Sequence, residues 1–69
     1  MTNNETIKRA DELTDRDLRL TTEGYAEVVA VSAVGTDRTR ITWKIERHGK
    51  VRRFSELAAN NYTYTIESH

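Results

Sequence analysis

Two segments, residues 40–47 and 50–54, alternate between apolar and polar side chains on either side of a His48-Gly49 loop. A two-residue loop that ends in glycine suits the type I′ turn of a β-hairpin, and this turn fixes which residues lie opposite each other. Trp43 then faces Phe54. One face of the hairpin collects Ile41, Trp43, Ile45 and Phe54, and the other collects Arg40, Thr42, Lys44, Glu46 and Arg53. A slip of one residue would mix the two faces, so the pattern predicts this register.

The rest of the chain also favours short strands. Residues 25–34 are rich in β-branched side chains and apolar on both faces, which is typical of a central strand. Tyr62, Tyr64 and Ile66 alternate with polar residues, which indicates a half-buried strand whose tyrosine hydroxyls reach solvent. We also expect a short strand near Ile7, a turn over residues 11–17, a strand from Leu18, a turn over residues 35–38, and one helical turn over residues 55–59 capped by Ser55.

The chain has 69 residues and no cysteine. A domain this short buries only about 60% of the surface of its unfolded chain, and its core rarely supplies more than about 3–5 kcal/mol. Self-association would add to this small stability. We expect a disordered end at residues 1–5 and a single domain at residues 6–69. The lack of cysteine, of a long apolar stretch and of a signal-peptide pattern favours a cytoplasmic protein without a membrane segment.

Five or six short strands separated by turns predict an all-β fold, a small antiparallel sheet closed or nearly closed into a barrel. The pattern of strands and turns resembles the SH3-like small barrels found in short proteins of actinobacteria and their phages. The resemblance rests on residues 10–20, residues 27–31, Phe54 and residues 62–67. The chain departs from it with Arg16 where those barrels often carry glycine, and with one extra residue before Leu13. The resemblance implies the fold and, by analogy, a small regulatory or accessory protein of the kind that phages encode.

Charge is balanced in total but segregated along the sequence. Eleven basic and eleven acidic side chains give a formal net charge of zero. Residues 38–53 nevertheless hold seven basic side chains against one carboxylate, Glu46, whereas residues 1–37 hold four basic and eight acidic ones. Local charge decides which partners a surface attracts, so this basic hairpin is the candidate binding site. Its proposed binding residues are Arg40, Lys44, Arg47, Lys50, Arg52 and Arg53.

Segregated charge favours an interaction module that docks on a protein partner or on a second copy of itself. Nucleic acid is the alternative partner, because a two-stranded ribbon fits the major groove of DNA and basic contacts to phosphates weaken steeply with salt. A third interpretation is a solvated face, whose basic side chains pair with acidic neighbours such as Glu23 or Glu27. Aromatic platforms for bases are scarce, because Trp43 and Phe54 fall on the core face and Tyr25 is the exposed candidate.

No catalytic constellation is evident in the sequence. A hydrolytic site needs a nucleophile, a base and a group that orients the base, but His48 falls in the hairpin turn and His69 lies at the C-terminus. The carboxylates Asp15 and Asp17 lack the further ligands and the central glycine of a calcium loop. The glycines stand too far apart to form a phosphate-binding loop. We therefore expect no enzyme, no metal, no cofactor and no small-molecule substrate.

Overall fold

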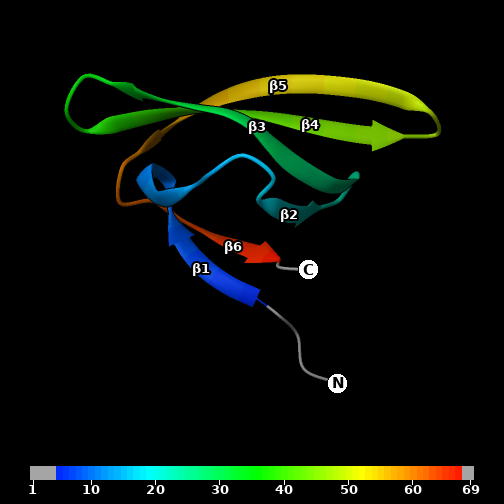
Figure 1. The fold of residues 1–69 in the computed structure, drawn as a ribbon, viewed down its shortest axis with the longest axis horizontal. Helices are drawn as coiled ribbons and strands as arrows, with labels where there is room; N and C mark the ends of the chain where they lie inside the picture. Colours follow the sequence, from blue (N-terminus) through cyan, green and yellow to red (C-terminus); the bar gives the residue numbers. More distant parts are fainter. Residues whose placement is uncertain (1–4, 68–69) are drawn as a thin grey trace.

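The computed structural model describes residues 5–67 as one antiparallel sheet with a single 3₁₀ turn. The strands are β1 (Glu5–Arg9), β2 (Leu18–Thr21), β3 (Gly24–Val34), β4 (Arg38–Arg47), β5 (Lys50–Ala59) and β6 (Thr63–Glu67), and the 3₁₀ turn η1 (Ala10–Glu12) follows β1. Their order across the sheet is β1-β6-β2-β3-β4-β5. In Figure 1 the long strands β3, β4 and β5 lie together, and β1 and β6 lie at the opposite end of the sheet. Within this part of the chain, no helix is long and apolar enough to cross a membrane.

Most of the expected strands are confirmed. The short strand near Ile7 is β1, the strand from Leu18 is β2, and the central strand is β3, which pairs with both β2 and β4. Of the disordered end expected at residues 1–5, residues 1–4 lie outside the described residues. Glu5 belongs to β1, where it pairs with Glu67 of β6.

β4 and β5 form the hairpin in the predicted register. Trp43 pairs with Phe54, and Lys44 pairs with Arg53. The loop residue His48 has a φ of 54° and Gly49 has a φ of 76°, and a type I′ turn requires two positive φ angles. Every second residue of β4 is buried, which defines the core face of the sheet: Thr39, Ile41, Trp43 and Ile45.

The helical turn expected over residues 55–59 is wrong, because β5 continues as a strand to Ala59. Ser55 pairs with Thr42 instead of capping a helix, and the two hydroxyl groups share a hydrogen bond of 2.9 Å. β4 offers backbone partners along its whole length, whereas a single helical turn satisfies few backbone groups. Strand pairing therefore overrides the local helical pattern, and the one helical turn among residues 5–67 is η1.

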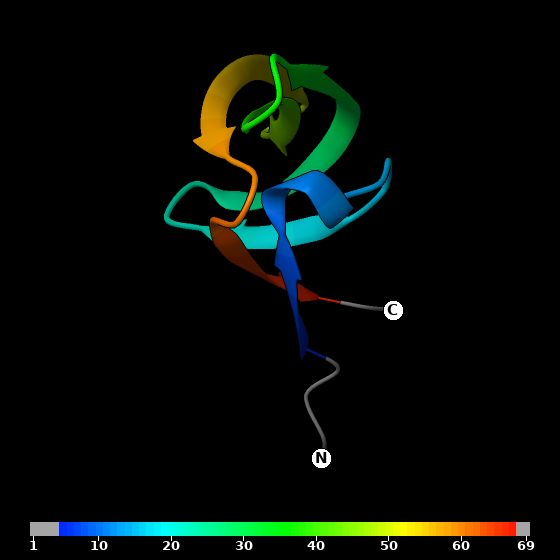
Figure 2. The same ribbon diagram turned by 90° about the vertical axis from the view of Figure 1, so that its left-hand side faces the viewer.

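The sheet does not close into the expected barrel. β1 and β5 are the two edge strands and do not pair with each other. β2 and β6 share one residue pair, Leu18 with Glu67, and separate from there. A bulge between Val28 and Ala30 bends β3, and Figure 2 shows the sheet curling without joining its edges. The chain after β5 enters β6, which lies between β1 and β2, so the outer edge of β5 has no neighbouring strand among residues 5–67.

Trp43 lies at the centre of a small core and is fully buried. The core collects Ala10, Leu13, Ala26, Val28, Ile41, Trp43, Ile45, Tyr64 and Ile66, with Val31, Phe54 and Ala58 packed against it. Thr39 is a polar residue buried beside this core, and its hydroxyl donates to Asn60 Oδ1 at 2.7 Å. Asn60 Nδ2 donates in turn to the Thr36 carbonyl at 3.2 Å. This network ties the turn after β5 to the turn before β4.

Arg16 lies in the turn before β2 and has a φ of 76°. This left-handed conformation costs a residue with a Cβ about 1–2 kcal/mol, whereas glycine adopts it freely. The Arg16 N–H donates to the Val28 carbonyl at 2.9 Å. The Asp17 carboxylate holds the same turn, because it accepts from the Thr14 N–H at 2.9 Å and from Lys8 Nζ at 3.1 Å. The chain therefore carries arginine at a position whose backbone geometry favours glycine.

We expect Arg16→Gly to raise the free energy of unfolding by about 0.5–1 kcal/mol, because the strain it removes exceeds the added entropy of glycine in the unfolded chain. Arg16→Ala is the matched control, since it shortens the side chain but keeps the Cβ, and it should stay within about 0.5 kcal/mol of wild type. Urea denaturation followed by tryptophan fluorescence measures both. Equal stability of the two variants would show that the positive φ stores no strain here.

Candidate interaction surfaces

The six proposed binding residues of the basic hairpin do not form one patch. Arg40, Lys44 and Arg53 lie on the face of β4 and β5 that points away from the core, as the register predicts. The other three, Arg47, Lys50 and Arg52, lie near the hairpin tip and line a hollow of about 190 Å³ together with Ile45 and Glu23. Arg52 pairs with the core residue Ile45, which puts its side chain on the core side of the sheet. The basic side chains are therefore divided between two faces.

Two of these side chains pair with the acidic neighbours expected from the sequence. Lys44 Nζ lies 3.4 Å from Glu27 Oε1, and Arg52 forms an ion pair with Glu23. The pairing that the solvated-face interpretation expects is thus present at Lys44 and Arg52. Such exposed pairs contribute little to stability. The remaining four basic side chains have no carboxylate of residues 5–67 within ion-pair distance. They are those of Arg40, Arg47, Lys50 and Arg53.

Tyr25 is exposed, as expected, at the start of β3. It lines a surface depression in which acidic and basic side chains are mixed: Glu23, Glu27, Lys44, Glu46 and Arg47, together with His48. A uniformly basic groove around an aromatic ring is therefore not present at Tyr25. The other histidine of the sequence, His69, lies outside the described residues.

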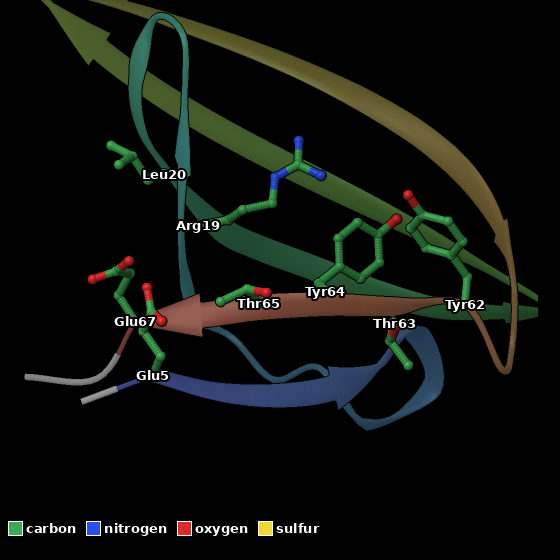
Figure 3. A pocket seen from close by; sticks show the side chains of 8 residues that line it. All are labelled: Glu5, Arg19, Leu20, Tyr62, Thr63, Tyr64, Thr65 and Glu67. Atoms are coloured by element: carbon green, nitrogen blue, oxygen red, sulfur yellow. The ribbon is translucent and has the colours of Figure 1, made fainter. Parts of the chain in front are cut away.

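A second surface, which the sequence did not reveal, lies where the sheet fails to close. Arg19 of β2 and Tyr64 of β6 come together over Trp43, and Figure 3 shows Arg19, Tyr62 and Tyr64 around the same opening. The Arg19 guanidinium carbon lies 4.5 Å from the centre of the Trp43 ring and 5.2 Å from that of Tyr64. These distances fit cation–π contacts. We call Arg19, Trp43, Glu56, Tyr62 and Tyr64 the seam cluster.

Glu56 of β5 completes the polar side of the seam cluster. The Tyr64 hydroxyl donates to Glu56 Oε2, and Arg19 Nη1 lies 3.9 Å from the same oxygen. Burial raises the pKa of the Tyr64 hydroxyl well above its usual value, and the hydrogen bond to the Glu56 carboxylate raises it further. The expectation that both tyrosine hydroxyls reach solvent is therefore wrong for Tyr64. Tyr62 is 57% exposed and packs edge-on against Tyr64 with 4.9 Å between ring centres.

The seam cluster contains buried nitrogens without hydrogen-bond partners. Within residues 5–67, neither Trp43 Nε1 nor Arg19 Nε has an acceptor. Leaving a buried donor unsatisfied costs about 1–3 kcal/mol. The stacking of Arg19 on the Trp43 ring offsets part of this cost, because a desolvated cation–π contact is worth about 2 kcal/mol.

Two adjoining hollows share Arg19, Tyr62 and Tyr64. One, of about 370 Å³, lies in the fork between β2 and β6 and includes Glu5 and Glu67. The other, of about 430 Å³, separates β6 from the free edge of β5 at residues 56–59. Partial desolvation raises the pKa of Glu67, and a hydrogen bond to Glu5 and the charge of Glu5 raise it further. Together the hollows form a groove along the open seam, with aromatic rings on one side and a free strand edge on the other.

The sequence signal for this surface was incomplete. Alternation did place Tyr62 and Tyr64 on one face of a strand, and only the separation of β2 from β6 exposes the groove beside them. Nothing local marks Arg19 as a ring-stacking residue, because its partners come from β4 and β6. Three-dimensional proximity of distant segments therefore defines this site.

Metal-binding geometry is not found in the part of the chain that the structure describes, where no three His, Asp or Glu residues converge. Asp17, one of the closely spaced carboxylates, bonds to Lys8 and Thr14 and so serves the turn. Comparison of the chain with protein-family models, with curated proteins and with solved structures finds no match.

The hydrogen bond at the seam can be tested with matched tyrosine variants. We expect Tyr64→Phe to lower the free energy of unfolding by about 1–2 kcal/mol, because it removes a hydrogen bond to a partly buried carboxylate. Tyr62→Phe, an exposed neighbour, should stay within about 0.5 kcal/mol. Because the pKa of Tyr64 is raised in the folded state, its stabilising effect is complete below the unfolded tyrosine pKa and declines as pH rises above it.

Urea denaturation at neutral pH and an absorbance titration of the phenolates check these two statements. Tyr64→Phe should remove the highest-pH step of the titration, and Tyr62→Phe should retain it. Loss of that step from the Tyr62 variant instead would contradict the assignment of the buried hydroxyl to Tyr64.

Proposed function

We propose that this chain is a non-catalytic interaction module, a small regulatory or accessory protein that docks on a protein partner or on a second copy of itself. The observation that carries the proposal is the open sheet. Its edge strand β5 pairs only with β4, and the free edge borders an aromatic groove at Tyr62 and Tyr64. We infer that the open six-stranded sheet is related to the SH3-like barrels and that a partner adds to it at the seam.

A free strand edge beside a groove supports docking by strand addition. An extended peptide that pairs with such an edge gains backbone hydrogen bonds, and alternate side chains enter the neighbouring pockets and give specificity. At this seam the exposed ring of Tyr62 and the exposed side chain of Leu57 would supply apolar contacts, and Arg19 would supply a positive charge. The groove therefore offers the features of a peptide site.

Nucleic acid is the second candidate partner. It is favoured by Arg40, Arg47, Lys50 and Arg53, for which no described carboxylate is an ion-pair partner. The division of the basic side chains between two faces works against it, because one duplex groove cannot contact both faces of a sheet. The mixed charge around Tyr25 also disfavours single-strand stacking at that ring.

Selection of peptides from a random displayed library against the immobilised chain tests the protein-docking proposal. We expect selected peptides to shift amide resonances of residues 56–59 and 62–65 and to bind at least about tenfold more weakly to Tyr62→Ala, because truncating an aromatic anchor at a binding site costs more than about 1 kcal/mol. Tyr25→Ala removes a similarly exposed tyrosine and should bind as wild type does. Peptides that are indifferent to Tyr62, or a selection that yields none from a chain that is also monomeric, would overturn docking at the seam.

Titration of isotope-labelled chain with short duplex and single-stranded oligonucleotides tests the second candidate. If phosphates are the target, shifts confined to residues 40–53 should appear at low salt and weaken steeply near physiological salt. The charge reversal Arg53→Glu should then abolish the shifts, and Arg9→Glu on β1 is the control. Silence at low salt would remove nucleic acid from consideration.

A further inference from the structure

The free edge of β5 is complementary to itself. A second copy that extends the sheet through this edge would run antiparallel and be related by a two-fold axis perpendicular to the sheet. Such an axis joins the core face of one copy to the core face of the other. Residues directly opposite each other then point to the same face, so one residue of β5 must lie on the axis, opposite the same residue of the second copy. The side chains of residues 50–58 then decide which residue can take that place.

With Phe54 on the axis, every pair across the new interface is compatible. Arg52 lies opposite Glu56 on the core side, and Val51 lies opposite Leu57 on the outer side, each twice. The remaining pairs are Phe54 with Phe54, Arg53 with Ser55, and Lys50 with Ala58. Cross-strand pairs of opposite charge and of apolar side chains stabilise a sheet, whereas like charges directly opposite destabilise it.

The neighbouring registers lack this complementarity. With Arg53 on the axis, two arginines face each other and Arg52 faces Phe54. With Ser55 on the axis, Glu56 faces Phe54 and Arg53 faces Leu57. A sheet interface prefers the register that satisfies charge and apolar contacts together. The pattern of β5 thus selects the register centred on Phe54.

The structure leaves the paired groups accessible. Val51 is 54% and Leu57 is 46% exposed, so neither is engaged in the core. Within the chain Arg52 pairs with Glu23, but this ion pair lies at the surface and can exchange for one with Glu56 of a second copy. Both contacts of Glu56 within the chain engage Oε2, which leaves Oε1 outside them.

The groove has space for side chains at the hairpin tip of the second copy. The hollow of about 430 Å³ beside residues 56–59 lies next to the half of β5 that would receive the hairpin tip of the other copy. That tip carries Lys50 and Arg52, and the groove presents Glu56 and the exposed ring of Tyr62. The opposite charges of the tip and the groove therefore favour this placement.

We propose that the chain forms a symmetric homodimer in which the β5 strands of two copies pair antiparallel about Phe54. The proposal rests on the proposed function as an interaction module, and it names a second copy of the chain as the partner at the β5 edge. The dimer joins two six-stranded sheets into one and covers both β5 edges. It also uses the basic hairpin tip, because Arg52 then meets a carboxylate of the other copy.

Sedimentation and light scattering over a range of concentrations test the dimer with three single variants. We expect wild type to dimerise, and Val51→Lys and Leu57→Glu each to raise the dissociation constant at least about tenfold, because each places a charge against an apolar side chain twice. An equimolar mixture of the two variants should recover dimers, since the lysine introduced at position 51 of one copy then faces the glutamate introduced at position 57 of the other. Ile7→Glu, at a residue 71% exposed on the opposite edge strand β1, is the control and should dimerise as wild type does.

Cysteine crosslinking tests the register itself, because the natural chain has no cysteine. Val51→Cys combined with Leu57→Cys should give a covalent dimer under mild oxidation, since directly opposed Cα atoms about 4.5–5.5 Å apart suit a disulfide. Either cysteine alone should give none, because residue 51 lies about 20 Å from its own copy in this register. Equal crosslinking of the single variants would overturn the register.

A wild-type chain that stays monomeric at millimolar concentration would overturn the dimer and assign the lysine and arginines of β5 to protection of a free edge. Dissociation by Ile7→Glu but not by Val51→Lys would also overturn it, in favour of contact through β1. Either result would leave the proposed function standing, provided that displayed peptides bind the wild-type chain and bind Tyr62→Ala more weakly. Failure of peptide binding with an intact dimer would leave self-association as the module's activity.

Discussion

Burial of the Trp43 ring is the interaction on which both the fold and the candidate site depend. β4 presents this ring to the core because it pairs with Phe54 on one side and Val28 on the other. Hiding a large aromatic side chain removes at least about 150 Å² of apolar surface from water, which is worth about 4 kcal/mol. That is comparable to the whole stability expected of a core this small. Any arrangement of the remaining strands must therefore keep this ring covered.

The cover over Trp43 explains why the seam cluster has its composition. β2 and β6 separate beside the Trp43 ring, so a continuous sheet does not cover the ring there. Arg19 and Tyr64 lie over the ring instead. An arginine can serve this purpose because its planar guanidinium stacks on aromatic faces while its charge is met by Glu56. The residues that seal the core are thus the same ones that line the groove. The side chains that cover the core are therefore also those that we propose to bind a partner.

The sequence predicted the hairpin better than any other part of the fold. A His-Gly loop and alternating side chains encode the β4–β5 register locally, and the structure confirms the pairing of Trp43 with Phe54. The helical turn after Ser55 and the barrel closure were not predicted correctly, because both depend on partners distant in sequence. Period-two alternation likewise placed Arg40, Lys44 and Arg53 on the outer face. The same register puts Arg52 opposite Ile45 on the core face, which the prediction of one binding site for all six basic residues did not take into account. The groove required the separation of β2 from β6, for which no local pattern exists.

The thin core and the open edge are two aspects of one constraint. A sheet that closed on itself would satisfy the backbone of β5 within the chain, but it would also pass over the space occupied by Tyr62 and the groove. The chain after β5 enters β6, which lies between β1 and β2. The outward-facing backbone N–H and C=O groups of β5 are therefore open to pairing with an added strand. Edge strands are commonly protected by charge, and on β5 the positive charges concentrate at Lys50, Arg52 and Arg53, with Glu56 further along the same strand. Segregated charge within one strand repels a parallel copy in the same register and attracts an antiparallel one. The charge pattern that protects the β5 edge therefore also favours pairing with an antiparallel copy of β5.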